Sequence, residues 1–163
     1  MDKETLRKRT CCFTGHRVIP KYAIINLEKQ LELAIIQLIE QGVVYFGAGG
    51  ALGFDTMAAQ TVLNLKKRYP QIKLILVLPC LSQAHSWDKD DISVYDTIKS
   101  KADKVVYTSQ EYSPGCMHKR NRHLVNNSRY CICYLTKETG GTAYTVNYAK
   151  SEGLEILNLA NRR

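Results

Sequence analysis

The chain has 163 residues, of which 45% are hydrophobic and 23% are charged, so it can bury one ordinary core but not two, and we expect a single domain over residues 1–163. No run of about eighteen apolar residues occurs, and the basic segment from Met1 to Thr10 is not followed by an apolar signal segment, which predicts a cytoplasmic protein without a membrane partner. The formal net charge of +8 favours an anionic partner, although a solvated basic surface explains it equally well.

Apolar runs that predict strands alternate along the chain with segments of helical periodicity. The strands are expected at 10–14, 43–46, 73–78, 105–108, 130–135 and 154–159. The helices are expected at 24–41, 54–68, 82–101, 119–127 and 143–150, and an acidic cluster breaks the third of them. Alternation of this kind predicts the α/β class, with a doubly wound, mostly parallel sheet and helices on both of its faces.

Three short glycine-bearing segments each follow a strand-like run and open a helix-like run. They are Thr14–Arg17, Gly47–Asp55 and Thr139–Thr142, and they contain seven of the ten glycines. The carboxyl ends of parallel strands meet at one edge of a sheet, so these segments would deliver backbone N–H groups to the same crevice. The arrangement predicts a site for an anionic, nucleotide-like ligand.

Two familiar phosphate-binding motifs are excluded by the residues themselves. A P-loop needs a lysine followed by serine or threonine after its glycines, whereas Gly53 is followed by Phe54. Counted from Gly47, the dinucleotide fingerprint fails because its last glycine falls one residue late, and the next strand ends at Leu78 without an acid for a ribose. NAD redox chemistry is therefore disfavoured, and we expect no cofactor.

The six cysteines lie mostly inside or at the ends of the strand-like runs, which favours small buried hydrophobic residues over disulfides. Cys131 and Cys133 would point to one face of a strand. No Cys-x-x-Cys pair occurs, and the pair Cys116 and His118 has no matching partner, so we expect no metal.

Several motifs occur in a fixed order along nearly the whole chain. They are Cys-Phe-Thr-Gly-His-Arg at the first strand end, Gly-Ala-Gly-Gly-Ala-Leu-Gly-Phe-Asp at the second, Trp87, Arg120-Asn-Arg122, Val125-Asn-Asn-Ser128, and Gly140-Gly-Thr142 before Tyr148-Ala-Lys150. In this order they resemble the YpsA family of the SLOG superfamily, which also contains the DNA-processing protein DprA and the LOG nucleotide phosphoribohydrolases. The resemblance implies a Rossmann-like fold and a nucleotide or nucleotide-derived ligand, and it does not name a reaction.

The candidate ligand-binding residues come from these motifs. Thr14 and Gly15 would place a hydroxyl and an unhindered backbone beside a phosphate, and His16 and Arg17 would add donors, the alternative being a plain strand-to-helix turn. The segment Gly140–Thr142 would bind phosphate at a helix N-terminus, with the same alternative. The full set is Thr14, Gly15, His16, Arg17, Gly47, Gly49, Gly50, Gly53, Asp55, Trp87, Arg120, Asn121, Gly140, Gly141 and Thr142.

Three of these residues, Asp55, Trp87 and Asn121, have a second interpretation. Asp55 holds a ribose hydroxyl or a base, or it caps its helix. Trp87 forms a lid or stacks on a base, or it packs in the core. Arg120 and Arg122 diverge on a regular helix, so we expect Arg120 to reach the crevice. Asn121 between them sets the loop or reads a base edge, or it caps a helix.

No catalytic residue is assigned. The LOG enzymes carry a glutamate in Gly-Gly-x-Gly-Thr-x-x-Glu, and Thr145 stands at the corresponding position of this chain. A hydrolase would need a displaced acid, either Asp55 or Glu111, at the crevice. We therefore favour a nucleotide sensor or binding protein, and keep a nucleotide N-glycosidic hydrolase and a DprA-like single-stranded DNA binder as alternatives. A homo-oligomer stays open, because an apolar helix face for a dimer looks like a core face in sequence.

Overall fold

The computed structural model describes residues 1–161, and the last two residues of the expected domain, 162 and 163, lie outside it. Its six strands form one parallel sheet in the order β4-β3-β2-β1-β5-β6. The strands are β1 Thr10–Gly15, β2 Tyr45–Ala48, β3 Lys73–Leu78, β4 Lys104–Tyr107, β5 Tyr130–Tyr134 and β6 Glu155–Asn158. The predicted doubly wound fold is confirmed, and the chain reverses its direction of winding between β1 and β5, where ligands bind in sheets of this type.

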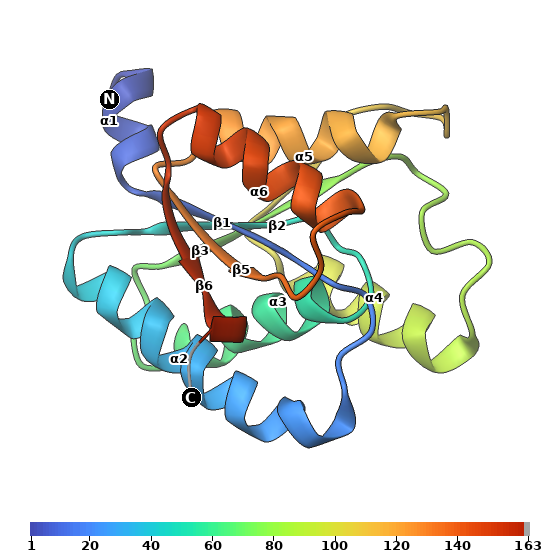
Figure 1. The fold of residues 1–163 in the computed structure, drawn as a ribbon, viewed down its shortest axis with the longest axis horizontal. Helices are drawn as coiled ribbons and strands as arrows, with labels where there is room; N and C mark the ends of the chain where they lie inside the picture. Colours follow the sequence, from blue (N-terminus) through green and yellow to red (C-terminus); the bar gives the residue numbers. More distant parts are fainter. Residues whose placement is uncertain (162–163) are drawn as a thin grey trace.

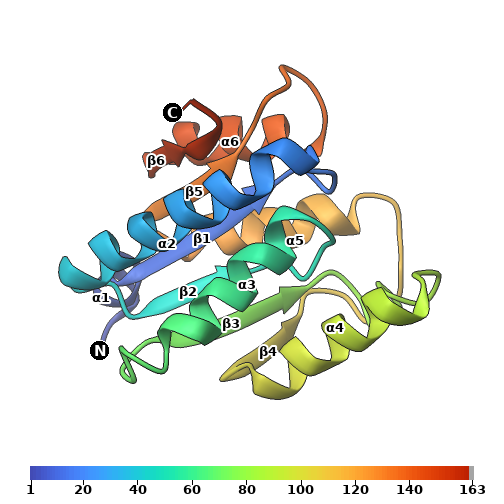
Figure 2. The same cartoon turned by 90° about the horizontal axis from the view of Figure 1, so that it is seen from below.

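Helices cover both faces of the sheet (Figures 1 and 2). On one face lie α2 Ile24–Glu40, α3 Phe54–Leu65 and α4 Lys89–Lys101, and on the other lie α5 Cys116–Asn126 and α6 Gly141–Ser151. The short α1, Lys3–Lys8, lies at the margin of this second face, and two 3-10 turns, Lys21–Ala23 and Leu159–Asn161, complete the elements. Within residues 1–161, none of the helices combines the length and the apolar character that a membrane crossing requires.

The core forms because the apolar positions follow the period of each element. On α2, Leu27, Leu31 and Ile35 are buried at helical spacing against the sheet. Strand side chains alternate, so Leu74 and Leu76 of β3 join the cluster under α2, α3 and α4, whereas Val77 joins the cluster under α5 and α6. Each fully buried side chain of this kind contributes about 1.5–3 kcal/mol of hydrophobic free energy.

The structure corrects the expected start of the third long helix. We expected helix from Ser82 and a break at the acidic cluster, but α4 begins at Lys89. The Asp88 side chain accepts a hydrogen bond from the backbone N–H of Asp91 (2.9 Å), so the acidic cluster caps the helix and does not break it. The prediction for the cysteines is confirmed, since all six are buried and free.

Candidate functional site

A crevice of about 290 Å³ opens at the carboxyl ends of β1 and β5, between the loops that follow these strands and the first turns of α5 and α6. Ten of the fifteen predicted residues line it: Thr14, Gly15, His16, Arg17, Asp55, Arg120, Asn121, Gly140, Gly141 and Thr142. Five residues without a predicted role complete the lining: Ala51, Met117, His118, Lys137 and Thr139. The predicted glycine segments therefore meet at the switch point of the sheet, the place between β1 and β5 where the direction of winding reverses.

The loop after β1 rests directly on the start of α3. A Cβ atom on Gly15 would lie 2.5 Å from the Phe54 side chain, and one on Gly53 would overlap the backbone carbonyls of His16 and Arg17. The backbone N–H of Phe54 donates a hydrogen bond to the carbonyl oxygen of His16 (3.1 Å). Only glycine permits this approach, so both glycines determine where the loop presents its side chains to the crevice.

Arg120 reaches from α5 behind the crevice and holds three parts of the chain together. It is only 3% exposed, and its Nη1 donates to the carbonyl oxygen of Gly49 and to Oε1 of Gln83 (3.3 Å). Its Nε donates to Oδ1 of the adjacent Asn121 (2.7 Å). Since a Cβ on Gly49 would lie 2.8 Å from the guanidinium carbon and 2.9 Å from Oδ2 of Asp55, this glycine lets both charged groups approach the loop.

Asp55 is the buried carboxylate of the crevice, with 6% exposure. Burial raises its pKa, and the positive charges of Arg120 and Arg17 oppose that shift. Its Oδ2 accepts a hydrogen bond from the backbone N–H of Ala51 (3.3 Å), while Gly53 occupies the N-cap position of α3. The carboxylate therefore fixes the glycine loop after β2 and faces the crevice.

Asn121 and Thr145 connect α5 with the start of α6. Nδ2 of Asn121 donates to the Thr145 hydroxyl (3.0 Å), which in turn donates to the carbonyl oxygen of Gly141 (2.9 Å). Thr145, which stands where LOG enzymes have their glutamate, is buried and belongs to this connection. The N-cap of α6 is Gly140, which provides no side-chain cap, so the N–H groups of the first turn lack partners within the helix.

His16 holds the loop after β5. Its Nε2 accepts a hydrogen bond from the backbone N–H of Thr136 (2.9 Å), and its ring meets the Tyr134 ring edge-on at 6.0 Å. Burial, and then the positive charge of Lys137, lower the pKa of His16 below its ordinary value of 6.5. The imidazole is therefore neutral at pH 7, with its proton on Nδ1.

This arrangement predicts a pH dependence of stability. The folded-state pKa of His16 lies below the unfolded value, so its contribution is complete above pH 6.5 and is lost as the pH falls through the folded-state pKa. The His16→Gln variant does not titrate there, and its amide oxygen can accept the same N–H. We expect the stability advantage of the unmodified chain over this variant, measured by urea unfolding, to shrink between pH 7.5 and 5.5. The pKa of His123 is also lowered, but this residue titrates in both proteins, so its effect cancels in the comparison. If the stability of the two proteins changes with pH in parallel, the assignment to His16 is wrong.

Positive charge dominates the crevice. Arg17 and Lys137 are exposed at its mouth, the buried Arg120 lines its inner wall, and among residues 1–161 Asp55 is the single acidic residue of the lining. The His118 ring tilts against Tyr144 at 4.2 Å between ring centroids. The electrostatics therefore suit an anionic ligand that also presents a hydrogen-bond donor to Asp55.

The structure leaves five predicted residues outside the lining. Gly49 and Gly53 lie against lining residues from behind, whereas a Cβ on Gly50 would meet Leu78, Gln83 and Tyr95, which are not in the lining. Gly47 lies within β2, where a Cβ would be 2.8 Å from the Leu124 side chain, so it serves the packing of α5 on the sheet. Trp87 is half-buried against the core.

Three side chains, Trp87, Arg122 and Glu111, lie away from the crevice. The ring of Trp87 packs edge-on to Tyr95 at 5.3 Å, which agrees with the core-packing interpretation. Arg122 diverges from Arg120, as expected, and donates to the Tyr144 hydroxyl (3.0 Å). Glu111 is exposed between β4 and α5 and does not line the crevice. Of the two candidate acids, the fold brings Asp55 to the site.

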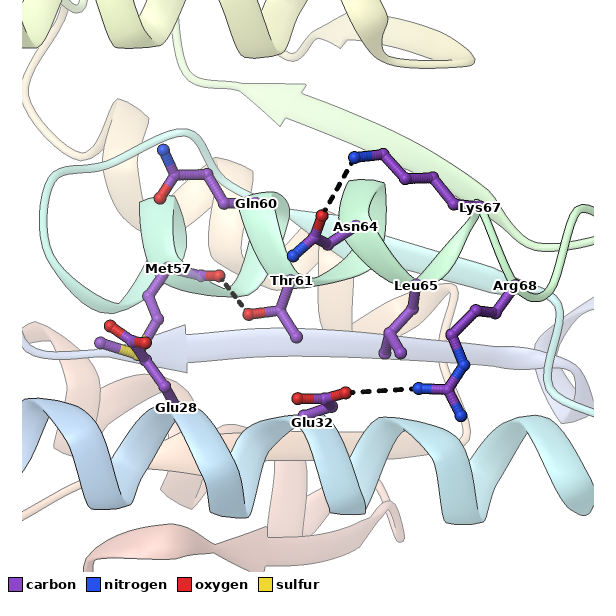
Figure 3. Close-up of a pocket in the computed structure, with 9 residues that line it drawn as sticks. All are labelled: Glu28, Glu32, Met57, Gln60, Thr61, Asn64, Leu65, Lys67 and Arg68. Carbon is purple, nitrogen blue, oxygen red and sulfur yellow. Dashed lines mark hydrogen bonds and ion pairs between the residues drawn. The ribbon is translucent and has the colours of Figure 1, made fainter.

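A second cavity, of about 510 Å³, lies between α2 and α3, on the face of the sheet that these two helices cover (Figure 3). Arg68 forms an ion pair with Glu32 (3.6 Å), and Lys67 donates to Asn64 (3.4 Å). Its lining comes from the sides of two helices and includes neither a glycine loop nor a helix N-terminus. The crevice at the switch point is therefore the better candidate for a ligand site.

An open parallel sheet with a glycine-walled crevice at its switch point defines a Rossmann-like protein. The model of the YspA SLOG family (YpsA) matches residues 15–156, and the chain belongs to this family. The uncharacterized SPbeta prophage-derived protein YoqJ of Bacillus subtilis (strain 168) is 31% identical over 140 residues, which cover 78% of this chain and 82% of YoqJ. A UPF0398 protein of Bacillus cereus (strain ATCC 14579) is 31% identical over 135 residues, covering 81% of this chain and 73% of the relative.

Two solved structures of DNA processing protein A share the fold. The protein from Streptococcus pneumoniae superposes with a TM-score of 0.68 at 21% identity, over 94% of this chain and 50% of that one. The protein from Helicobacter pylori, which has a described single-stranded DNA binding mode, gives a TM-score of 0.65 at 18% identity, over 95% of this chain and 67% of that one. The chain thus spans half the length of the streptococcal structure, and at these identities the likeness concerns the fold.

Proposed function

We propose that the chain binds a nucleotide or a nucleotide-derived phosphate compound in the crevice and acts as a sensor or binding protein. One observation carries this proposal: an uncapped helix N-terminus, two exposed cations and a single buried carboxylate converge on one small cavity. The family and the fold are compatible with such a ligand at a coarse level.

In the proposed complex, the phosphate lies at the start of α6. The N–H groups of Gly141 and Thr142 donate to it, and the helix dipole adds to the attraction. Arg17 and Lys137 neutralise the remaining charge, and Asp55 accepts a hydrogen bond from a hydroxyl of the sugar. A cavity of about 290 Å³ lies at the small end for ligand sites, which favours a mononucleotide over a dinucleotide.

The first test combines binding and turnover. The protein is incubated with mononucleotides, dinucleotides and ADP-ribose, and the melting temperature and the product masses are read from the same wells. Stabilisation by a nucleotide without new masses is the expected result. The absence of any shift across the panel would overturn the proposal.

Thr142→Glu separates binding from stability. A carboxylate in the first turn of α6 suits the helix dipole, so the melting temperature without ligand should stay the same or rise slightly. The same charge repels a phosphate at that position, and we expect affinity to fall at least about tenfold. Ser151→Glu, at the other end of α6, is the matched control and should bind as the unmodified chain does. Equal affinity of the two variants would exclude the start of α6 as the phosphate site.

Asp55 supports a second candidate, a nucleotide N-glycosidic hydrolase. It is a buried acid with a raised pKa at the crevice, the environment in which a carboxylic acid can donate a proton to a leaving base. A released base in the wells above would establish this activity. Asp55→Asn should then abolish the release while nucleotide binding persists.

The DprA structures favour a third candidate, the binding of single-stranded DNA. Beside the crevice, the exposed Tyr144 contacts the His118 ring and the Arg122 side chain, a combination of aromatic and basic groups on which a base can stack. Affinity for an oligonucleotide should then fall steeply with salt and drop in Tyr144→Ala. If neither added salt nor Tyr144→Ala changes the affinity for the oligonucleotide, this candidate is excluded.

A further inference from the structure

One part of the sheet lacks a helix on the face that carries α5 and α6. Within residues 1–161, these two helices make their main contacts with β1, β3, β5 and β6, and β4 lies beyond them. A groove of about 400 Å³ runs here between α1, α5 and the strands β2, β3 and β4. Parallel sheets are normally covered by helices on both faces, so the uncovered strands leave room for one more helix.

The floor of this groove is mostly aliphatic, and Tyr45 of β2 adds one aromatic ring to it. Ile75 and Val77 of β3 point into it because the alternation of the strand directs Leu74 and Leu76 to the other face. Val106 of β4 extends the floor and is half-buried.

The walls add further apolar surface. Leu124 of α5 closes one side of the groove, and Leu6 of α1 stays 38% exposed on the other. Helix α1 buries none of its residues, so its side of the groove is left uncovered by the rest of the chain. This apolar surface is continuous with the floor.

The rim is basic. Lys3, Arg7, Lys104 and His123 surround the floor, and among residues 1–161 the groove lining includes no aspartate or glutamate. Burial, and then the positive charges of Lys104 and Lys3, lower the pKa of His123, so its ring is neutral at pH 7 and Lys3, Arg7 and Lys104 supply the positive charge of the rim. Glu4 pairs with Arg7 from the same helix (3.0 Å) and lies outside the lining.

We infer that this groove docks an acidic amphipathic helix of a partner protein. The apolar stripe of the helix covers the accessible side chains Ile75, Val106 and Leu6, and its flanking carboxylates meet Lys3 and Lys104. Over residues 1–161, most of the apolar lining is aliphatic and its one tyrosine, Tyr45, is half-buried, which favours an apolar helix over nucleic acid, whose bases stack on exposed aromatic rings. Within the part of the chain that the structure describes, the groove and the crevice share no lining residue, so the inference does not depend on the proposed ligand.

Three synthetic helices of sixteen residues test the inference. They share one leucine stripe and carry glutamate, glutamine or lysine beside it, and fluorescence anisotropy measures their binding to the full chain. We expect the glutamate helix to bind at least about tenfold more tightly than the glutamine helix, and its affinity to fall as the salt concentration rises. The lysine helix should not bind. Equal affinities, or no binding of the glutamate helix, would overturn the inference.

Two variants locate the binding. Lys104→Glu should weaken the glutamate helix about tenfold or more, and Lys101→Glu, the same charge change on the exposed surface of α4, should not. Val106→Asp should abolish binding, with a melting curve as the check on folding. If Lys104→Glu leaves the affinity unchanged while the peptide still binds, the groove is not the docking site.

Two further measurements distinguish other occupants. A dimer seen by analytical ultracentrifugation and lost in Val106→Asp would assign the groove to a second copy of the chain and overturn the inference. Binding of a fifteen-residue thymidine oligonucleotide that is lost in Lys104→Glu would assign it to nucleic acid, with the same consequence. If the chain is monomeric, a second copy is excluded as the occupant of the groove. If Lys104→Glu also leaves oligonucleotide binding unchanged, nucleic acid is excluded, and the partner helix is supported.

Discussion

Arg120→Met is expected to lower the free energy of unfolding by about 3 kcal/mol or more at pH 7.5. Methionine keeps much of the side-chain volume, but the carbonyl of Gly49 and Oε1 of Gln83 then lose their donor inside the protein. Asp55 loses the main positive charge that opposes the rise of its pKa, so it takes up a proton or remains buried as an anion. Urea unfolding measures the change.

Arg122→Met is the matched control for this variant. Arg122 lies two residues further along α5 and makes a surface hydrogen bond to Tyr144, so its loss should cost about 0.5 kcal/mol or less. The double variant Asp55→Asn with Arg120→Met should recover part of the lost stability, because the buried carboxylate is then gone. Equal destabilisation by Arg120→Met and Arg122→Met would show that Arg120 is not needed to hold the loops.

Gly53→Ala is expected to destabilise the fold by about 3–5 kcal/mol and to remove ligand binding. Gly53 has φ +76° and ψ −119°, a conformation that side-chain-bearing residues rarely adopt. In addition, its Cβ would overlap the carbonyl of Arg17 and lie 2.6 Å from that of His16, and these are backbone atoms that cannot rotate away. The loop after β1 would have to move, and the phosphate contacts with it.

Gly153→Ala distinguishes backbone strain from overlap. Gly153 has φ +81°, close to that of Gly53, yet among residues 1–161 no atom lies within 4 Å of a Cβ at this position. Gly153→Ala should therefore introduce backbone strain alone and lower the free energy of unfolding by about 1–2 kcal/mol. Ligand binding should persist. If the two alanine variants lose the same stability, the contact between Gly53 and the loop does not determine its position.

The fold was predictable because its signals are local. The strand over 73–78 is a continuous apolar run that ends before Pro79, and its predicted bounds agree with β3. The start of α4 depended on whether Asp88 breaks or caps a helix, and a single hydrogen bond to the N–H of Asp91 decides between the two. The sequence alone does not distinguish a helix break from a helix cap at this position, because aspartate is common in both.

The site was predictable where a residue directly follows a strand, and less so where side-chain direction decides. Gly47 and Gly49 lie in one motif, but Gly47 is still within β2 and faces α5, while Gly49 follows the strand and meets Arg120. His118 is outside the predicted set because it has no partner at an informative spacing in the sequence. Helix α5 starts at Cys116, directly after Gly115, and not at the predicted residue 119. Its first turn therefore faces the crevice with residues that had been assigned to a loop.

Helix α5 borders both proposed sites. Met117, Arg120 and Asn121 in its first turns wall the crevice, and His123 and Leu124 further along wall the groove. A helix of 11 residues, about 16 Å long, moves as one rigid rod, so a tilt imposed at one end is transmitted to the other. If the two occupants prefer different tilts, each changes the affinity of the other, and thermodynamics requires the factor to be the same in both directions.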